Sequence, residues 1–233
     1  MSTEREASLY LAQILFQSKQ FPELVVLMKK VVEMNPELNI DERAILSSSY
    51  KGQITQFRDG ISHIMNLIET ENSSNRLQIL ENMKKELLLD LERVCLDLIG
   101  LVDDKLLPAT KDTESIFFYM NLKADYYRYL SETSNGDISD KYSPQAKDLY
   151  EKCIEFGKKE IPSFNPASMA LYLNYTVFLN DVLKDQSNAV SIAKKVIQEN
   201  IPLIDQNSAE SFDKSRQIIG RMQENIKFWT NEE

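Results

Sequence analysis

Apolar residues recur at helical spacing along nearly the whole chain, and short polar or proline-containing breaks separate the periodic stretches. Because no long linker and no shift of composition divides these stretches, the pattern predicts one antiparallel all-α domain over residues 1–233. A tandem array of helical hairpins is the weaker interpretation, since no repeat signature of fixed length is present. The predicted helices cover residues 5–19, a second stretch that starts at Pro22 and ends before Pro36, then 41–69, 77–107, 113–133, 144–161, 166–183, 188–203 and 208–230.

Prolines and small polar residues set the predicted helix ends. Pro22 suits the first turn of the second helix, where a missing N–H costs no intrahelical hydrogen bond. Asp41 is a candidate cap for the third helix, and Pro108 is expected to stop the fourth. The stretch 134–136, Ser-Asn-Gly, is the clearest flexible connection between helices.

The first predicted helix is unusual because apolar side chains crowd nearly every face. A helix of this kind is usually buried on several sides, and at a chain terminus a partner subunit is one candidate for the cover. The residues concerned are Leu9, Tyr10, Leu11, Ile14, Leu15 and Phe16.

Composition and charge narrow the range of functions. The 233 residues include only six glycines and seven prolines, which suits a mostly helical chain. A net charge of -9 argues against nonspecific binding to nucleic acid or to an anionic membrane, although it is compatible with a small basic pocket. Charged residues interrupt the leucines of 77–107, so we expect no membrane insertion. No secretory signal is apparent, which makes the cytoplasm the expected compartment.

No pattern in the sequence indicates catalysis. His63 is the only histidine, and the glycines are scattered singly instead of gathering in a phosphate-binding loop. Cys95 and Cys153 are too few and too far apart for a zinc site or a disulfide framework. We therefore predict no enzyme activity, no catalytic residue, no cofactor and no metal.

The segment 124–130, Ala-Asp-Tyr-Tyr-Arg-Tyr-Leu, is the most informative stretch for function. Helical spacing puts Asp125, Arg128 and Tyr129 on one face. A guanidinium beside a carboxylate and a phenol offers a planar fork of donors to a phosphate or a carboxylate. The alternative is a helix packed through its aromatic residues, with an ion pair on its surface.

Two asparagines extend this chemistry. Asn174 lies within an apolar helical surface, where an amide without partners would cost about 1 to 3 kcal/mol. It should therefore meet either another helix or the backbone of a bound chain. Asn225 and Trp229 lie one helical turn apart near the C-terminus. Together they can hold an extended peptide, or the tryptophan can simply dock its helix.

These stretches, in their order along the chain, resemble the 14-3-3 family of phosphoserine and phosphothreonine adaptor proteins. The similarity extends from the second predicted helix to Trp229. The segments that carry it are Asp41-Glu42-Arg43 with Ser49-Tyr50-Lys51, then Asp125 to Leu130, Leu173 to Phe178, and Asn225 to Thr230.

The resemblance implies nine antiparallel helices that form a concave groove for phosphopeptides. It also implies dimerisation through N-terminal helices within about 1–35, with the groove built by about 41–230. The partners would be phosphorylated client proteins and a second subunit, identical or related. Lys51 and Arg58 are two turns apart, roughly 10 Å along one helix face. The implied phosphate-binding residues are Lys51, Arg58, Arg128 and Tyr129.

The resemblance further implies a groove that binds the peptide beside its phosphate. Asn174 and Asn225 would bind the peptide backbone, between flanking side chains and an apolar wall. The flanking residues are Asp181 and Trp229, the wall residues are Leu173, Val177 and Ile218, and Arg221 lies in the same groove.

The groove departs from the family pattern. Gln217 and Arg221 stand where the family has apolar residues, and Ser48 replaces a small aliphatic one. These changes make the groove wall more polar. Arg221 is suited to acidic residues of a ligand or to a second phosphate.

The implied dimer interface departs as well. Gln20 and Glu23 stand where the family has charged residues that form ion pairs between subunits, and they would face Glu86 and Asp90. Electrostatic attraction between the subunits is lost there, and with it one determinant of partner specificity. An apolar first helix can compensate with a larger hydrophobic interface, or it can pack differently and leave a monomer or another dimer.

Two hypotheses follow. The first is a binding adaptor that holds phosphorylated client segments in its groove and regulates the clients. The second is a non-catalytic helical scaffold whose altered groove binds unphosphorylated or acidic partners. The implied phosphate-binding residues favour the first hypothesis, whereas Gln217 and Arg221 favour the second.

Overall fold

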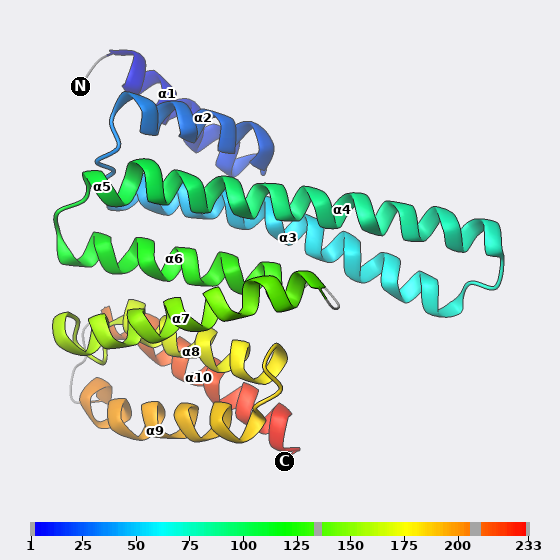
Figure 1. Ribbon diagram of the computed structural model, residues 1–233. Coiled ribbons are helices and arrows are strands. Elements are labelled where there is room, and N and C mark those ends of the chain that lie inside the picture. The colour runs from blue at the N-terminus through cyan, green and yellow to red at the C-terminus, as the bar shows by residue number, and fades with distance from the viewer. Residues whose placement is uncertain (1–2, 133–136, 206–210, 232–233) are drawn as a thin grey trace. The chain divides into compact units, whose positions relative to one another are not determined.

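A computed structural model describes residues 3–132, 137–205 and 211–231 (Figure 1). Within these ranges every regular element is helical, which confirms the predicted all-α class. The described residues form nine helices when the three consecutive helical segments between 74 and 109 are counted as one. The chain has two compact units, Met1–Lys111 and Asp112–Glu233, and each is described by itself. The assignment of a single domain stays a prediction.

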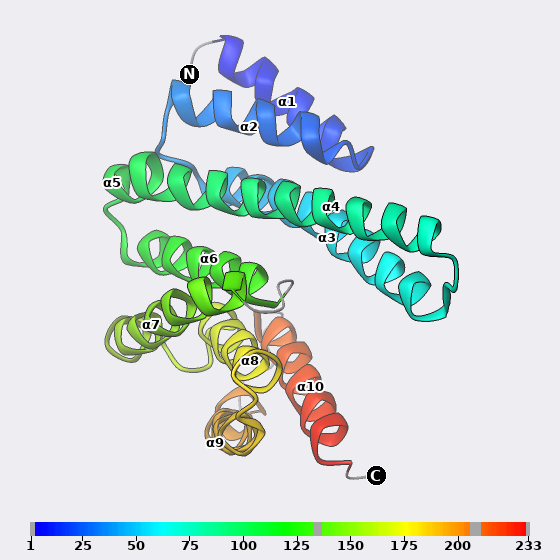
Figure 2. The ribbon, with the colours of Figure 1, turned by 45° about the vertical axis from the view of Figure 1, so that its right-hand side comes forward.

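The first unit is built on a long helical hairpin. Its helices are α1 (Thr3–Gln17), α2 (Phe21–Met34), α3 (Ile40–Thr70), α4 (Ser74–Leu101), η1 (Val102–Leu106) and α5 (Leu107–Ala109). α3 and α4 run antiparallel side by side, while α1 and α2 form a second hairpin that packs on α3 (Figures 1 and 2). The completely buried side chains between these helices include Leu24, Met28, Leu46, Tyr50 and Leu98.

The N-terminus of α3 is capped by Asn39, so the prediction that Asp41 caps it is wrong. Asn39 Oδ1 accepts a hydrogen bond from the Glu42 N–H at 2.9 Å, and Glu42 Oε2 accepts one from the Asn39 N–H at 3.0 Å. This reciprocal capping box satisfies two backbone donors of the first turn. Asp41 lies inside that turn instead, where its charge favours the positive end of the helix dipole.

A buried ion pair fastens α1 to α3. Arg5 Nη1 and Nη2 donate to Glu42 Oε1 and Oε2 at 2.7 and 2.8 Å, and the two side chains are 7% and 6% exposed. Burial alone would raise the pKa of the Glu42 carboxyl, but hydrogen bonds from Arg5 and from the Asn39 N–H hold it below its ordinary value. The hydrogen bond to Glu42 raises the pKa of Arg5. Glu42 therefore both caps α3 and anchors α1.

The prediction that α1 is buried on several sides is wrong for the isolated chain. Along α1 only Arg5 and Ala12 are buried, whereas Tyr10, Leu11 and Ile14 are 68%, 46% and 44% exposed. One stripe of the helix packs on α2 and α3, and the remaining apolar side chains stay on the surface because the described residues of this unit supply no further layer. A partner subunit as their cover stays a prediction.

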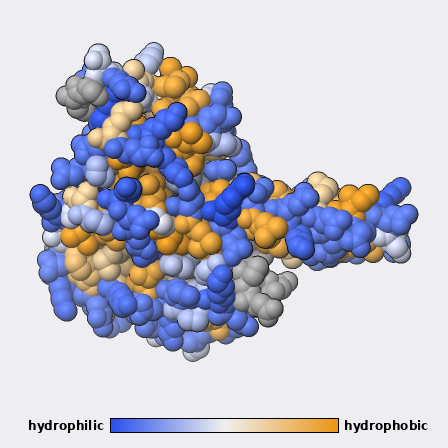
Figure 3. Space-filling model, turned by 45° about the horizontal axis from the view of Figure 1, so that its top comes forward, coloured by the Kyte–Doolittle hydropathy of each residue, from blue (hydrophilic) through white to orange (hydrophobic). Residues whose placement is uncertain are grey.

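Apolar side chains also reach the surface at the far end of the α3–α4 hairpin (Figure 3). Leu67, Ile79 and Met83 are 41%, 58% and 49% exposed there. These side chains are separated by charged residues, as in an amphipathic helix. Of the helices described, none has a stretch long and apolar enough to cross a membrane.

The fourth helix continues past the stop predicted at Pro108. The π-helical segment η1 follows α4, and the Leu107 N–H donates to Val102 O across five residues. The helix ends only at Thr110, whose backbone is extended and whose Oγ1 donates to Leu106 O at 2.7 Å. Pro108 is tolerated in the last turn because a wider turn eases the clash between a proline ring and the preceding carbonyl.

The second unit contains α6 (Thr113–Glu132), α7 (Asp137–Glu160), α8 (Pro166–Asp181), α9 (Gln186–Asp205) and α10 (Ser211–Thr230). α6 pairs with α7, and α8, α9 and α10 lie against one another (Figure 2). Two apolar clusters form the core. The first includes Phe117, Tyr150, Leu171, Tyr175 and Phe178, and the second includes Met169, Val196, Ile219, Met222 and Ile226.

α7 begins earlier than predicted and contains Pro144, which was expected to lie at its start. The turn before this proline is anchored by Tyr142, which is 3% exposed and lies 6.1 Å from the Tyr127 ring between centroids. Burial of the Tyr142 side chain compensates for the backbone hydrogen bond that Pro144 cannot donate. The flexible stretch predicted at 134–136 and the start of the last helix predicted at 208 lie outside the described residues.

Candidate functional site

A polar cluster inside the second unit surrounds Arg128, whose side chain is only 7% exposed. Its Nε donates to the Tyr150 hydroxyl of α7 at 3.1 Å. Glu132, one turn further along α6, forms an ion pair with Nη1. Asp125 lies one turn earlier, with Oδ1 3.9 Å from Nε, and the Tyr129 ring centroid lies 4.4 Å from Cζ. Neighbours on two helices thus fix the guanidinium.

Asp125 connects this cluster to α8. Its Oδ1 accepts a hydrogen bond from the Tyr150 hydroxyl at 2.6 Å. Asn174 Nδ2 donates to Oδ1 at 3.0 Å and to Oδ2 at 2.9 Å. One carboxylate therefore positions the phenol of α7 and the amide of α8 against α6. The described residues give no partner to the carbonyl oxygen of Asn174, which stays available as an acceptor.

The cluster holds its groups in defined protonation states. Burial opposes the positive charge of Arg128, but the oxygens of Tyr150, Glu132 and Asp125 keep its pKa above the ordinary value, so the guanidinium stays ionised. Burial raises the pKa of the Tyr150 phenol well above its ordinary value, and the Asp125 carboxylate raises it further. Tyr150 is therefore a neutral hydroxyl that donates to Asp125 and accepts from Arg128.

The structure agrees only in part with the chemistry predicted for this segment. Asp125 lies beside Arg128 as expected, but the nearer carboxylate is Glu132, which the sequence analysis missed. The spacing of four residues between Arg128 and Glu132 was a usable signal. Tyr150 was also missed, because it lies 22 residues away on another helix and no local pattern marks it. The alternative of a surface ion pair is wrong, since the side chains of Arg128 and Glu132 are only 7% and 10% exposed.

Lys51 and Arg58 belong to the first unit, where both lie on α3. Lys51 is exposed and Arg58 is half-buried. Tyr50 precedes Lys51 and is fully buried, with its hydroxyl donating to Asp97 Oδ2 at 2.6 Å. Lys29 of α2 binds the other oxygen of the same carboxylate on α4. This network joins three helices and holds the backbone of α3 beside Lys51.

The residues predicted to line the groove lie on one face of α8 and one face of α10, which together we call the α8–α10 face. Leu173 and Ile218 pack against the same apolar cluster, and Trp229 packs against the other. Asp181 and Arg221 are exposed, whereas the remaining members are half-buried. The α8–α10 face comprises Leu173, Asn174, Val177, Asp181, Ile218, Arg221, Asn225 and Trp229.

Of the two roles that the spacing of Asn225 and Trp229 suggested, the structure contains the docking of the tryptophan, and peptide binding stays a prediction. The Trp229 ring packs against the core, and Gln186 Nε2 donates to the Trp229 backbone oxygen, so the tryptophan does dock the end of α10. Part of its surface nevertheless stays exposed. Within the described part of the chain the Asn225 side chain has no hydrogen-bond partner, which leaves its amide available to a bound chain.

The described residues contain no group of three or more His, Cys, Asp and Glu side chains that could hold a metal ion. Cys95 and Cys153 are free and buried. Burial raises the pKa of the Cys153 thiol to about 12, and the Asp125 carboxylate contributes, so this thiol stays protonated. His63 is exposed on α3.

Comparison with known proteins finds similarity over nearly the whole chain. The model of the 14-3-3 protein family matches residues 11–230. The chain is 32% identical to the checkpoint signal transducer rad25 of Schizosaccharomyces pombe, over 100% of this chain and 87% of that protein. It is 30% identical to the 14-3-3-like protein GF14 epsilon of Arabidopsis thaliana, over 100% and 92%. It is 31% identical to the 14-3-3 protein beta/alpha of Xenopus tropicalis, over 95% and 91%.

Proposed function

Because the chain belongs to the 14-3-3 family, we propose that it binds client proteins through segments that carry phosphoserine or phosphothreonine. Proteins of this family are non-catalytic adaptors, and this chain is accordingly a binding protein and not an enzyme. The proposal adds three points to family membership: dependence on phosphate, the residues that bind the phosphate, and the residues that bind the peptide beside it.

The observation that supports the proposal most strongly is the buried guanidinium of Arg128. Tyr150 and Glu132 hold its Nε and Nη1, and the described residues give its Nη2 no hydrogen-bond partner. A donor fixed in this way loses little further freedom when it binds a phosphate oxygen. Each charge-assisted hydrogen bond can contribute about 1.5 to 3 kcal/mol. An unmodified serine offers no such charge to the site.

The charge of the cluster suggests that Arg128 needs further cations to bind a phosphate. One guanidinium and the carboxylates of Asp125 and Glu132 sum to a formal charge of +1 - 2 = -1. A phosphoserine brings a further charge of about -1.5 to -2. The family resemblance implies that Lys51, Arg58 and the Tyr129 hydroxyl are further phosphate-binding residues, and we keep that assignment as part of the proposal.

The α8–α10 face is proposed to bind the peptide beside the phosphate. The amide hydrogens of Asn174 are bonded to Asp125, but its carbonyl oxygen remains available as an acceptor. Asn225 has both its amide hydrogens and its carbonyl oxygen available. Such groups match the N–H and C=O groups of an extended backbone. The side chains proposed to contact those of the peptide are Leu173, Val177, Asp181, Ile218, Arg221 and Trp229.

The second candidate function is a scaffold for unphosphorylated or acidic partners. The observation that favours it is the polar character of α10, where Gln217 and Arg221 are both exposed. It is the weaker candidate because burying an ionised guanidinium is costly. A surface that bound only neutral partners would have no use for such a group, and the carboxylate of an acidic partner carries less charge to offset this cost than a phosphate does.

Binding of a phosphoserine peptide library and of its unphosphorylated twin tests the proposal. We expect the phosphorylated library to bind at least about 100-fold more tightly, because two or more charge-assisted hydrogen bonds are lost with the phosphate. Fluorescence anisotropy at one ionic strength measures both, and a third library with glutamate at the phosphosite separates charge from geometry. Equal binding by the first two would favour the scaffold, and absence of binding by all three would contradict both functions.

We also propose that the exposed apolar residues of α1 are covered by a second 14-3-3 subunit, identical or related. Tyr10, Leu11 and Ile14 lie on one side of α1, opposite the buried Arg5 and Ala12. Burial of such side chains releases roughly 25 cal/mol per Å² of apolar surface. Since the ion pairs of the family interface are absent here, this apolar contact would supply most of the association free energy.

Ile14→Glu tests the dimer. We expect sedimentation to show the wild type as a dimer at micromolar concentration and the variant with a dissociation constant raised at least about 10-fold, because the new carboxylate would be buried unpaired. Gln13→Glu is the matched control, since residue 13 is about 100° away around the helix. A wild type that remains monomeric both alone and when mixed with a related 14-3-3 protein would contradict the proposal.

A further inference from the structure

α10 differs in charge from every other helix that the structure describes. Its four basic residues and two acidic residues give a formal charge of 4 - 2 = +2, whereas each other described helix is neutral or negative and the chain as a whole carries -9. A basic helix in an acidic protein concentrates attraction for anions at one place. The charged residues of α10 are Lys214, Arg216, Arg221 and Lys227, with Asp213 and Glu224.

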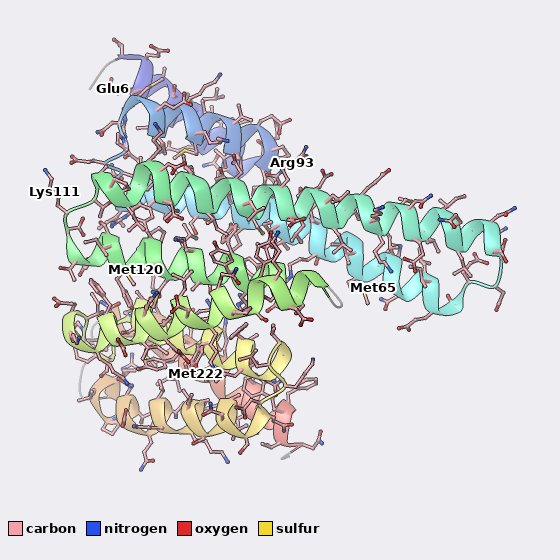
Figure 4. The ribbon with its side chains drawn as sticks, in the orientation of Figure 1. Glu6, Met65, Arg93, Lys111, Met120 and Met222 are labelled. Carbon is pink, nitrogen blue, oxygen red and sulfur yellow. The ribbon has the colours of Figure 1, made fainter. Side chains whose placement is uncertain are left out.

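Two of these cations share the side of α10 that borders the α8–α10 face. Lys214 and Arg221 are separated by seven residues, roughly 10 Å along the helix, and both are exposed. Phe228 follows after another seven residues and is 83% exposed. Another side of α10 faces the core, and Met222, labelled in Figure 4, belongs to it with 0% exposure.

Arg221 is an arginine of α10 that the described part of the fold does not use. Arg216 on the same helix donates to Asp213 at 3.0 Å and to Ile204 O at 3.2 Å, so its charge is engaged inside the unit. Arg221 has no ion pair or hydrogen bond to any described residue, although Glu224 lies one turn further along the helix. Its five donors are therefore available to a ligand.

A continuous series of contacts connects Arg221 with the proposed phosphate site inside the second unit. Ile218, one turn before Arg221, packs against the same cluster as Leu173. Asn174 follows Leu173 in sequence and donates to Asp125, which lies one turn from Arg128. A client segment that is bound at Arg128 and runs along the α8–α10 face therefore meets Arg221 within the same surface.

We propose that Arg221 selects client segments that carry a second anionic group beside the phosphorylated residue. This inference rests on the proposed function and adds to it the class of preferred client. A guanidinium binds carboxylate and phosphate alike through two parallel hydrogen bonds, so the second group is either an aspartate or glutamate side chain or a second phosphate. Lys214 raises the local positive potential without providing a planar fork.

The test measures three phosphoserine peptides of one length. The first has only neutral residues around the phosphoserine, the second has a glutamate scanned through the flanking positions, and the third has a second phosphoserine at the best of those positions. We expect wild type to bind the second and third peptides roughly 3- to 10-fold more tightly than the first, since the added ion pair is partly exposed. This preference should shrink as salt is raised.

Arg221→Gln and its control Lys227→Gln complete the design. Lys227 is also exposed, but it lies on a different side of α10 from Arg221. We expect Arg221→Gln to bind the second and third peptides no more tightly than the first, while Lys227→Gln keeps the preference. A preference that survives in Arg221→Gln, or equal binding of the first two peptides by wild type, overturns the inference. Failure of wild type to bind any phosphopeptide overturns the proposed function and the inference with it.

Discussion

Replacing Arg128 by alanine should abolish phosphopeptide binding and also lower the free energy of unfolding by about 3 to 5 kcal/mol. The binding loss follows because the variant lacks the only guanidinium in the cluster of described residues around Asp125 and Glu132. The stability loss follows because both carboxylates then lose the guanidinium that lies between them. Isothermal titration with a phosphoserine peptide and urea unfolding measure the two effects on the same preparation.

Two further variants separate recognition from stability. Arg128→Lys keeps a positive charge beside Glu132 but has no planar fork, so we expect most of the stability to remain and phosphopeptide affinity to fall at least about 10-fold. The double variant Arg128→Met with Glu132→Gln removes both partners of the ion pair. It should recover at least half of the stability that alanine loses, because the buried charge of Glu132 is removed together with its partner, yet it should not regain binding.

These variants make the role of Arg128 refutable even if the alanine variant unfolds. Phosphopeptide affinity within about 2-fold of wild type in either Arg128→Lys or the double variant would show that the phosphate binds elsewhere. Loss of binding together with loss of near-ultraviolet circular dichroism in Arg128→Lys would instead point to a structural role for this residue.

Local periodicity predicted the helices well, but side-chain capping and packing decided where they end. The hydrophobic spacing alone places the helices of both units, because each buries one stripe of apolar residues. The start of α3 was missed since both Asn39 and Asp41 are good caps, and only the reciprocal bond from Glu42 distinguishes them. Pro144 was read as a helix start, whereas burial of Tyr142 extends α7 before it.

The candidate site was predictable where its residues are neighbours along one helix. The spacing of Asp125, Arg128 and Tyr129 is enough to place them together. The contact between Asn174 and Asp125 joins residues 49 positions apart, and no periodicity signals it. For Asn174 the sequence left two partners open, another helix or a bound chain. In the structure the Asn174 amide donates to Asp125 of α6. Its carbonyl oxygen has no partner among the described residues and is available to a bound chain.

The second large effect concerns the attachment of α1. Arg5→Met should lower the free energy of unfolding by about 3 to 5 kcal/mol, because Glu42 would remain buried without its cation. Adding Glu42→Gln should recover part of this loss, since glutamine is neutral and can still accept from the Asn39 N–H. Urea unfolding measures both variants. The matched control is Glu6→Gln, which changes an exposed carboxylate on the same helix.

The same ion pair should make the attachment of α1 sensitive to acid. The pKa of Glu42 is lower in the folded chain than in the unfolded one, so its stabilisation is complete above the ordinary glutamate pKa of about 4.3 and is lost as pH falls toward the folded value. We expect the difference in stability between wild type and Arg5→Met to shrink below pH about 4.

Proteolysis at neutral pH tests the attachment of α1 separately. Since α1 would detach first, cleavage at Lys19 by a lysine-specific protease should be faster in Arg5→Met than in Glu6→Gln. Equal cleavage and equal stability in those two variants would mean that apolar packing, and not the ion pair, holds α1 on α3.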